Sequence, residues 1–462
     1  MSVRNNEENV PKNANFSHIR SLLLFRVEKL QGSFTHTVVS NFKLVQVLDL
    51  QDIPLETLHD EIGNLIHMRY FCVRNTKIKA LPNTIGKLEY IETLDLRGTS
   101  VAEMPIGIFK LNHLRNLLVD RFIFLGGNKT KRGLKARKGI GNLTSLEKLA
   151  FIEANQEGGN NLVRELEKLI ELKRLGIVRI RRDDVMHLCA SIEKMSHLCS
   201  LTIKSLDDYE LLDFDHLLSP PRSLQRLYLD SPLERLPNWI VSLDSLVKLR
   251  LGTSRLKDNP IGSLRVLHNL VDLILHAESY DGDEMLIEAG GFDRLKVFRL
   301  IGQERLTILR VEEGAMPVLE DIRIEGCKQL CRAPEGIQHF SNLKYLCFVD
   351  MPPEFELSIM PLLLLYFEER MLSEKLPNAY FSRKHEGRRV RYSAMDVALA
   401  FRRRSGEQSQ FAPKHFFVVT ITFRFVKKVV SLIKKLGLLI WVTIVYDILS
   451  LSPIHVVKKV VI

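Results

Sequence analysis

The residues best suited to chemistry in this chain are charged and tyrosine side chains that flank regularly spaced apolar pairs. In each pair one residue separates the two apolar positions, as Tyr228 separates Leu227 from Leu229. This alternation is typical of a β-strand with one buried face, so the flanking residues project from the opposite face. The predicted contact residues on that face are Tyr70, Arg174, Arg179, Lys204, Arg226, Tyr228, Lys248, Arg250, Arg299 and Arg323.

The chemistry open to these residues is electrostatic recognition. Acidic residues share the predicted face at Asp49, Asp95, Asp230, Asp272 and Asp321. We therefore predict a mixed, mostly basic groove that docks an acidic protein surface through charge complementarity. The alternative is an ordinary solvated face, because polar residues cover most protein surfaces.

The sequence lacks motifs for catalysis, metal binding and nucleotide binding. Neither G-x-S-x-G nor H-E-x-x-H occurs, and residues 127–132 do not match the phosphate-binding loop. Cys327 and Cys331 have no second Cys or His pair nearby to complete a metal site. Cys327 also occupies the repeat position of Thr76 and Thr99, so we expect it to be buried. The prediction is a non-enzymatic chain without a cofactor or metal ion.

The elements that must position the contact residues follow a repeat of 23 residues. Leu48, Phe71, Leu94 and Leu117 are each 23 residues apart. One unit follows L-x-x-L-x-L-x-x-T-x-L, the leucine-rich-repeat pattern. The L-x-L step predicts a short strand, and the flanking three-residue apolar spacing predicts a helical or 3-10 return on the other face.

The repeat continues along the rest of the chain, with less regular spacing between the apolar pairs. The predicted buried pairs are Leu22/Leu24, Leu48/Leu50, Phe71/Val73, Leu94/Leu96, Leu117/Val119, Leu149/Phe151, Leu175/Ile177, Leu201/Ile203, Leu227/Leu229, Leu249/Leu251, Leu273/Leu275, Phe298/Leu300, Ile322/Ile324 and Leu346/Phe348. We predict an α/β leucine-rich-repeat solenoid, a horseshoe with a concave parallel sheet of about 13–14 short strands. Such a stack presents a long surface rather than a catalytic pocket.

Composition divides the chain into four segments. They are a polar N-terminal linker at 1–18, the solenoid at 19–360, a basic and disordered linker at 361–414, and an apolar, Lys-rich tail at 415–462. Inside the solenoid, Ile108 and Ile140 are 32 residues apart instead of 23. The excess predicts a basic loop insertion at about 126–138, exposed and mobile because of its Gly and Lys content.

The tail at 415–462 has no charge-free run long enough to cross a membrane. Its longest apolar run, residues 436–446, is short of the roughly 20 residues that a spanning helix needs. A segment lying on the membrane surface is the favoured interpretation. A tail translated from sequence that was never selected as protein is the alternative.

The net charge of +11 belongs to the C-terminal segment. Residues 381–462 hold 16 Lys or Arg and 4 Asp or Glu, a balance of +12, which leaves −1 for residues 1–380. A solenoid that bound nucleic acid would carry the positive charge on its repeats, so no nucleic-acid partner is expected. No apolar signal follows Met1, and the six cysteines lack a framework spacing. We expect a cytoplasmic location, with membrane association only through the tail.

Several sequence segments closely resemble those of one protein family. They are Val47–Leu50, Arg74–Ile78, Leu94–Thr99 and Met351–Phe355, and the opening from Asn5 to Leu24 is similar to the start of that family's repeats. The family is the plant intracellular nucleotide-binding leucine-rich-repeat disease resistance proteins of the coiled-coil class. The resemblance extends over about residues 4 to 357.

The resemblance implies a sensor in the defence response, which binds a pathogen effector or a guarded host protein. The family's coiled coil, phosphate-binding loop and switch motifs are absent from this sequence, so no nucleotide site is carried over. One alternative is an adaptor that binds the nucleotide-binding module of a separate immune receptor in trans. The other alternative is a truncated gene product with little function.

Overall fold

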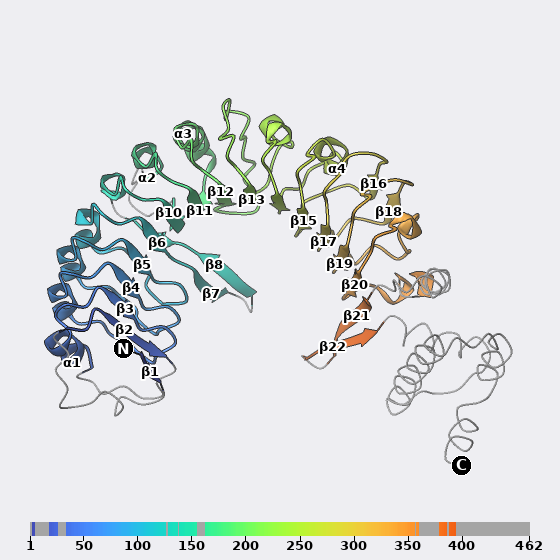
Figure 1. Ribbon diagram of the computed structural model, residues 1–462. Helices are drawn as coiled ribbons and strands as arrows, with labels where there is room; N and C mark the ends of the chain where they lie inside the picture. Colours follow the sequence, from blue (N-terminus) through green and yellow to red (C-terminus); the bar gives the residue numbers. More distant parts are fainter. Residues whose placement is uncertain are drawn as a thin grey trace, which may run out of the picture. The chain divides into compact units, whose positions relative to one another are not determined.

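The strands of the repeats form one curved sheet in the computed structural model (Figure 1). The structure describes residues 2–4, 18–25, 34–125, 128–136, 138–154, 162–355, 357–359, 378–385 and 388–393. Its contacts divide the chain into two units, residues 1–391 and 392–462. The repeats belong to the first unit, and the second lies almost entirely outside the described residues.

Fourteen described strands occupy the fourteen predicted positions. They are β2 (Ser21–Phe25), β3 (Val47–Asp49), β4 (Tyr70–Cys72), β5 (Thr93–Asp95), β6 (Asn116–Leu118), β10 (Lys148–Glu153), β11 (Arg174–Ile180), β12 (Ser200–Ser205), β13 (Arg226–Asp230), β14 (Lys248–Gly252), β15 (Asp272–His276), β17 (Val297–Ile301), β19 (Asp321–Glu325) and β20 (Tyr345–Val349). Each pairs in parallel with the next. The predicted leucine-rich-repeat solenoid is confirmed.

The core is a set of apolar columns that run from repeat to repeat. Leu201, Leu227 and Leu249 align in register on neighbouring strands, and each is 0–1% exposed. Polar residues inside the coil bond to its backbone: the Thr76 hydroxyl donates to the Val73 carbonyl at 2.7 Å. Cys327 takes the equivalent position and is 0% exposed, which confirms it as a core residue.

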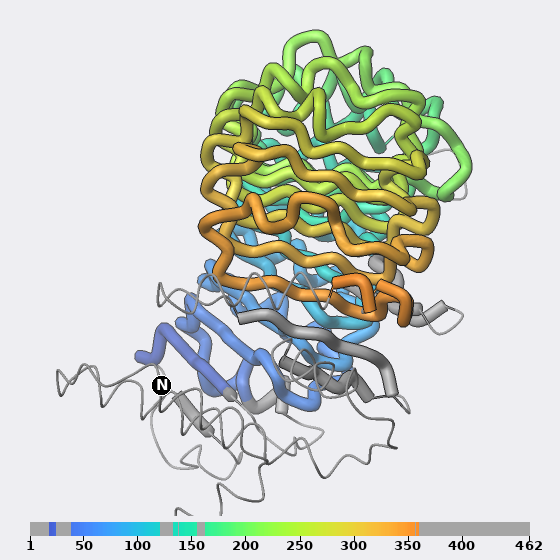
Figure 2. The backbone as a smooth tube through the Cα atoms, turned by 90° about the vertical axis from the view of Figure 1, so that its right-hand side faces the viewer, coloured from blue at the N-terminus to red at the C-terminus, as the bar shows by residue number. Residues whose placement is uncertain are grey.

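The outer returns of the first repeats are 3-10 helices, as predicted: η2 (Asp60–Asn64), η3 (Asn83–Lys87) and η4 (Ile106–Lys110). Later returns comprise η5 (Ile140–Asn142), α2 (Leu162–Glu165), η6 (Leu166–Lys168), α3 (Arg182–Glu193), η7 (Asn238–Ser242), α4 (Pro260–Leu264) and η8 (Ile337–His339). In the view turned by 90°, successive coils run nearly parallel to one another (Figure 2). The helix α1 (Phe34–Asn41) connects β2 to β3 and lies at the N-terminal end of the outer row of returns, next to η2.

Two returns differ from the prediction because their sequences alternate with period two. The segments β16 (Glu284–Ile287) and β18 (Ile308–Val311) pair in parallel as a second, two-stranded sheet. In β16, Met285 and Ile287 are buried while Glu284 and Leu286 are half-buried. An alternating pattern suits a strand with one buried face better than a 3-10 turn.

The predicted loop insertion is instead an antiparallel hairpin. It consists of β7 (Arg121–Leu125) and β8 (Asn128–Arg132), and a short strand, β9 (Leu134–Lys135), follows it. The hairpin projects from the sheet into the space that the arc encloses (Figure 1). The expectation of a loop was wrong because the apolar residues of β7 lie before the Gly- and Lys-rich part from which the loop was inferred.

Both residues of the predicted pair Leu149/Phe151 are buried, but the strand register changes between them. Beyond Leu149, which faces Leu175, the register shifts, and Ile152 rather than Phe151 faces Ile177. The backbone of Phe151 is left-handed, with φ of 49°, so a β-bulge inserts one extra residue. Bulges of this kind leave no signature in apolar alternation.

Both predicted linkers contain strands. β1 (Ser2–Arg4) pairs in parallel with β2, inside the segment predicted as a linker at 1–18. β21 (Asn378–His385) pairs with β20, and β22 (Arg388–Ser393) joins the same sheet, inside the segment predicted as disordered at 361–414. The tail at 415–462 lies outside the described residues. Among the described helices, none is long and apolar enough to cross a membrane.

Candidate functional site on the concave face

Each repeat strand presents alternate residues to the concave face, because its other residues enter the core. The parallel register aligns these residues into columns that cross the sheet. From β12 to β20 the middle column reads Thr202, Tyr228, Arg250, Ile274, Arg299, Arg323 and Cys347. Because adjacent strands lie about 4.8 Å apart, neighbouring members of a column can touch a single ligand segment.

Three of the predicted basic residues have acidic partners on the same face. Lys204 lies 3.5 Å from Asp230 and Lys248 lies 3.3 Å from Asp272, each pair joining neighbouring strands. Arg323 donates to Glu325 on its own strand at 2.5 Å. The acidic partners largely neutralise these positive charges. Lys204, Lys248 and Arg323 therefore attract an acidic binding partner less strongly than unpaired basic residues would.

Other basic residues keep an uncompensated charge. Arg174 and Arg226 are exposed and make no ion pair with any described residue. Arg299 is half-buried, also lacks a described ion-pair partner, and lies directly in register with Arg323. The carboxyl of Asp321 is near both arginines, yet burial raises its pKa.

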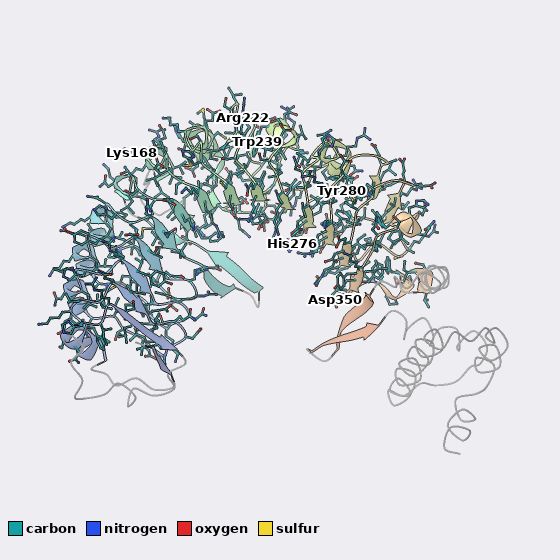
Figure 3. All side chains as sticks on the ribbon, in the orientation of Figure 1. Lys168, Arg222, Trp239, His276, Tyr280 and Asp350 are labelled. Carbon is teal, nitrogen blue, oxygen red and sulfur yellow. The ribbon has the colours of Figure 1, made fainter. Side chains whose placement is uncertain are left out.

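Arg250 lies against a histidine that the sequence analysis had not singled out. Its Nη2 is 3.3 Å from Nδ1 of His276, and since a guanidinium can only donate, that nitrogen accepts. Burial and the charge of Arg250 lower the pKa of His276 below its ordinary value. His276 is therefore neutral at pH 7 and leaves the charge of Arg250 in place. Figure 3 shows His276 on the inner edge of the arc, whereas Lys168 and Arg222 lie on the outer edge.

We call the set Arg226, Tyr228, Arg250, Ile274 and Arg299 the cationic strip. It spans β13 to β17 and combines three uncompensated guanidinium groups with one aromatic and one aliphatic side chain. Ile274 was missed by the sequence analysis because apolar residues were assigned to the core. Its half-exposed position between Arg250 and Arg299 follows from the strand register.

Tyr70 lies away from this strip, on β4 near the start of the sheet. Burial is the main cause that raises the pKa of its phenol, and Cys72, Asp49 and Asp95 add to the effect. Asp95 is 2% exposed and accepts three hydrogen bonds from the Arg97 guanidinium, the shortest at 2.5 Å. Tyr70 therefore belongs to a separate and more acidic part of the face.

Arg179 departs from the predicted contact position. Its backbone is left-handed, with φ of 62°, where the pairing of β11 with β12 shifts register. Its Nε lies 3.8 Å from Oε2 of the buried Glu153. The bulge turns Arg179 toward an internal carboxylate instead of toward the regular columns.

A buried apolar cluster also lies at the bulges. Ala150, Phe151 and Val178 are 2–7% exposed and pack together. A Cβ at Gly176 would lie 2.8 Å from the Phe151 nitrogen and 3.3 Å from its ring, so glycine makes room for Phe151. Glycine within a strand is a sequence signal for such a close approach.

The described residues lack a cluster of metal-ligating side chains. No group of three His, Cys, Asp or Glu side chains in this part of the chain could ligate an ion. A small hollow lined by Leu212, Glu234 and Pro237 also contains Asp215, which is paired with Arg235 at 2.6 Å.

Comparison with known proteins agrees with this architecture. A family model described as the leucine-rich repeat region matches residues 18–351. The disease resistance protein RPM1 of Arabidopsis thaliana is 31% identical over 212 residues, which are 46% of this chain and 22% of that protein. The disease resistance protein RPP8 of the same plant is 28% identical over 356 residues, 75% of this chain and 37% of that protein.

Two solved structures are similar to this chain at low sequence identity. A leucine-rich-repeat protein of Leptospira interrogans has a TM-score of 0.40 at 18% identity, covering 76% of this chain and 95% of that chain. The Arabidopsis receptor kinase HAESA, solved with the peptide hormone IDA and the co-receptor SERK1, has a TM-score of 0.43 at 14% identity and covers 77% and 62%. The family model spans most of the chain, and the chain therefore belongs to the leucine-rich repeat family, in the form that it shares with plant disease resistance proteins.

Proposed function

We propose that this chain is a non-catalytic recognition module of plant defence, whose concave face binds an acidic protein surface. The observation that carries the proposal is the cationic strip, in which Arg226, Arg250 and Arg299 make no ion pair within 4 Å with any described residue. Uncompensated guanidinium groups beside a tyrosine and an isoleucine match the composition of protein-binding hot spots.

The partner that we propose is a pathogen effector or a guarded host protein, bound in the cytoplasm. The names of RPM1 and RPP8 as disease resistance proteins support the defence role. This chain spans 22% of the first relative and 37% of the second. Any activity that requires a whole resistance protein is therefore part of this proposal. A nucleotide-binding module of such a receptor is the competing partner.

The test reverses two charges of the cationic strip that make no described ion pair, in the double variant Arg226→Glu/Arg299→Glu. The matched control reverses Lys87 and Lys110, which are exposed on the outer 3-10 turns and also make no described ion pair. Partners captured from infected and healthy leaf extract are identified, purified and titrated against each variant at two salt concentrations.

We expect the strip variant to bind the purified partner at least tenfold more weakly, which corresponds to about 1.4 kcal/mol. The control variant should stay within twofold of the wild type. Higher salt should weaken binding to the wild type, because the contacts are charged. Equal affinity of the wild type and the strip variant would refute the role of the concave face. Capture of a nucleotide-binding module alone would favour the adaptor function.

A further inference from the structure

The middle column of the concave face alternates uncharged and charged side chains from β13 to β17. In register it reads Tyr228, Arg250, Ile274 and Arg299, with one residue on each of four neighbouring strands. All four are half-buried, so each keeps part of its surface open to a partner. Arg250 and Arg299 make no ion pair with any described residue. The column therefore offers an aromatic contact, a cation, an aliphatic contact and a second cation, in that order.

Positive charge exceeds negative charge around this column. The charged side chains at the concave positions of β13, β14, β15 and β17, four basic and two acidic, are Arg226, Lys248, Arg250, Arg299, Asp230 and Asp272. Both acidic residues already pair with a lysine of a neighbouring strand, at 3.5 Å and 3.3 Å. Asp321, on the next strand, is near Arg299 but makes no ion pair with it. A ligand that follows the column thus meets a net positive surface.

The spacing of the column matches one face of an α-helix. From its first to its last residue the column spans about 14.4 Å, because neighbouring strands lie about 4.8 Å apart. Helix residues i, i+3, i+7 and i+10 share one face and rise by about 4.5, 10.5 and 15 Å from the first. An extended peptide presents every second residue, so four contacts would span about 20 Å. A helix laid across the strands stays in step with the column, whereas an extended peptide is about 5 Å out of step at the fourth residue.

We propose that the partner docks an amphipathic α-helix across β13 to β17, and that the contact face of this helix alternates apolar and acidic residues. The apolar residues i and i+7 pack on Tyr228 and Ile274, and the acidic residues i+3 and i+10 pair with Arg250 and Arg299. Arg226 lies beside Tyr228 on β13 and adds a third guanidinium at the flank of the helix. Figure 1 shows β13, β15 and β17 along the inner edge of the arc. This inference rests on the proposed function, because it names the segment of the partner that is recognised.

The experiment titrates fluorescent peptides against the full chain. The test peptide is an Ala-rich helix former with Leu at i and i+7 and Glu at i+3 and i+10. An extended control carries the same four residues two positions apart in a Thr-rich background, which favours a strand. A proline control replaces a central alanine of the test peptide by Pro, which breaks the helix.

A protein variant probes the centre of the column. Ile274→Asp places a carboxylate between Arg250 and Arg299. Its matched control is Ile106→Asp, which makes the same change on the outer turn η4, where Ile106 is 59% exposed. Circular dichroism verifies that each variant is folded.

We expect the test peptide to bind the wild type at least tenfold more tightly than either control peptide. Ile274→Asp should weaken this binding at least tenfold, because the new carboxylate pairs with the arginines and repels the glutamates. Ile106→Asp should stay within twofold of the wild type. The proposal is overturned if the test peptide does not bind, if the extended peptide binds as tightly, or if Ile274→Asp leaves the affinity unchanged.

The natural partner separates this inference from the proposed function. If Arg226→Glu/Arg299→Glu weakens its binding and Ile274→Asp does not, only the helix-docking inference fails. If neither variant weakens its binding, the proposed function fails as well.

Discussion

The close stacking of the outer turns leads to a sharp prediction for Gly86→Ala. In η3, a Cβ at Gly86 would lie 2.4 Å from the carbonyl oxygen of Gly107 and 2.9 Å from its Cα. Both atoms belong to the backbone of the next repeat, so no flexible side chain can move aside. The two repeats must separate locally, and overpacking of this kind costs about 1–3 kcal/mol.

Gly262→Ala is the matched control. Gly262 lies in α4, its backbone is not left-handed, and the nearest atom to a new Cβ would be Oε1 of Glu288 at 3.9 Å. Alanine there should stabilise the protein by about 0.4–1 kcal/mol, since it restricts the unfolded chain and favours the helix. The two variants should therefore differ by about 1.5–4 kcal/mol in the free energy of unfolding.

Urea denaturation gives the overall difference, and hydrogen exchange shows where it arises. Because each repeat contacts only its neighbours, Gly86→Ala should accelerate exchange within residues 83–118 and leave residues 297–349 unchanged. Equal unfolding free energies for Gly86→Ala and Gly262→Ala would refute the steric reasoning. Uniformly faster exchange along the whole chain would refute the nearest-neighbour coupling.

Three further predictions concern single residues. Leu227→Ala removes a side chain that is 0% exposed and should cost about 2–5 kcal/mol in urea denaturation. Burial and Arg250 lower the pKa of His276, so its contribution to stability is complete above the unfolded value of about 6.5 and falls as pH drops below it. His276→Gln should flatten this acid-side loss, and an unchanged pH profile would contradict the assignment. Burial raises the pKa of the Cys327 thiol to about 12, whereas Cys331 is exposed. Iodoacetamide should label Cys331 first in the native protein, as mass spectrometry would show; equal labelling would argue against a buried Cys327.

The positions of the repeat strands could be predicted because each depends on local alternation. Both residues of all fourteen predicted pairs are buried, but at Leu149/Phe151 the register shifts, and Ile152 rather than Phe151 faces Ile177. The bulge depends on how Phe151 packs over Gly176 in the next repeat. The alternation of apolar residues along one strand cannot predict a contact between residues that are 25 positions apart.

The candidate site could be predicted only in outline. Alternation along the strands was enough to propose basic residues for the concave face, but not to decide which charges remain uncompensated. Lys248 is paired with Asp272 at 3.3 Å, whereas Arg226 has no described ion-pair partner. The two residues occupy equivalent positions on neighbouring strands, and only the side chains across the sheet distinguish them.

The sequence by itself determined the solenoid, the family and the order of the strands, because one short apolar pattern recurs in every repeat. Tertiary structure decided the bulges, the hairpin and the cationic strip. The bulges and the cationic strip depend on residues about 24 positions apart, whose separation and orientation are set by the stacking of repeats. The electrostatic free energy of a charged side chain depends on its neighbours in space. The sequence of this chain does not show which residues those neighbours are.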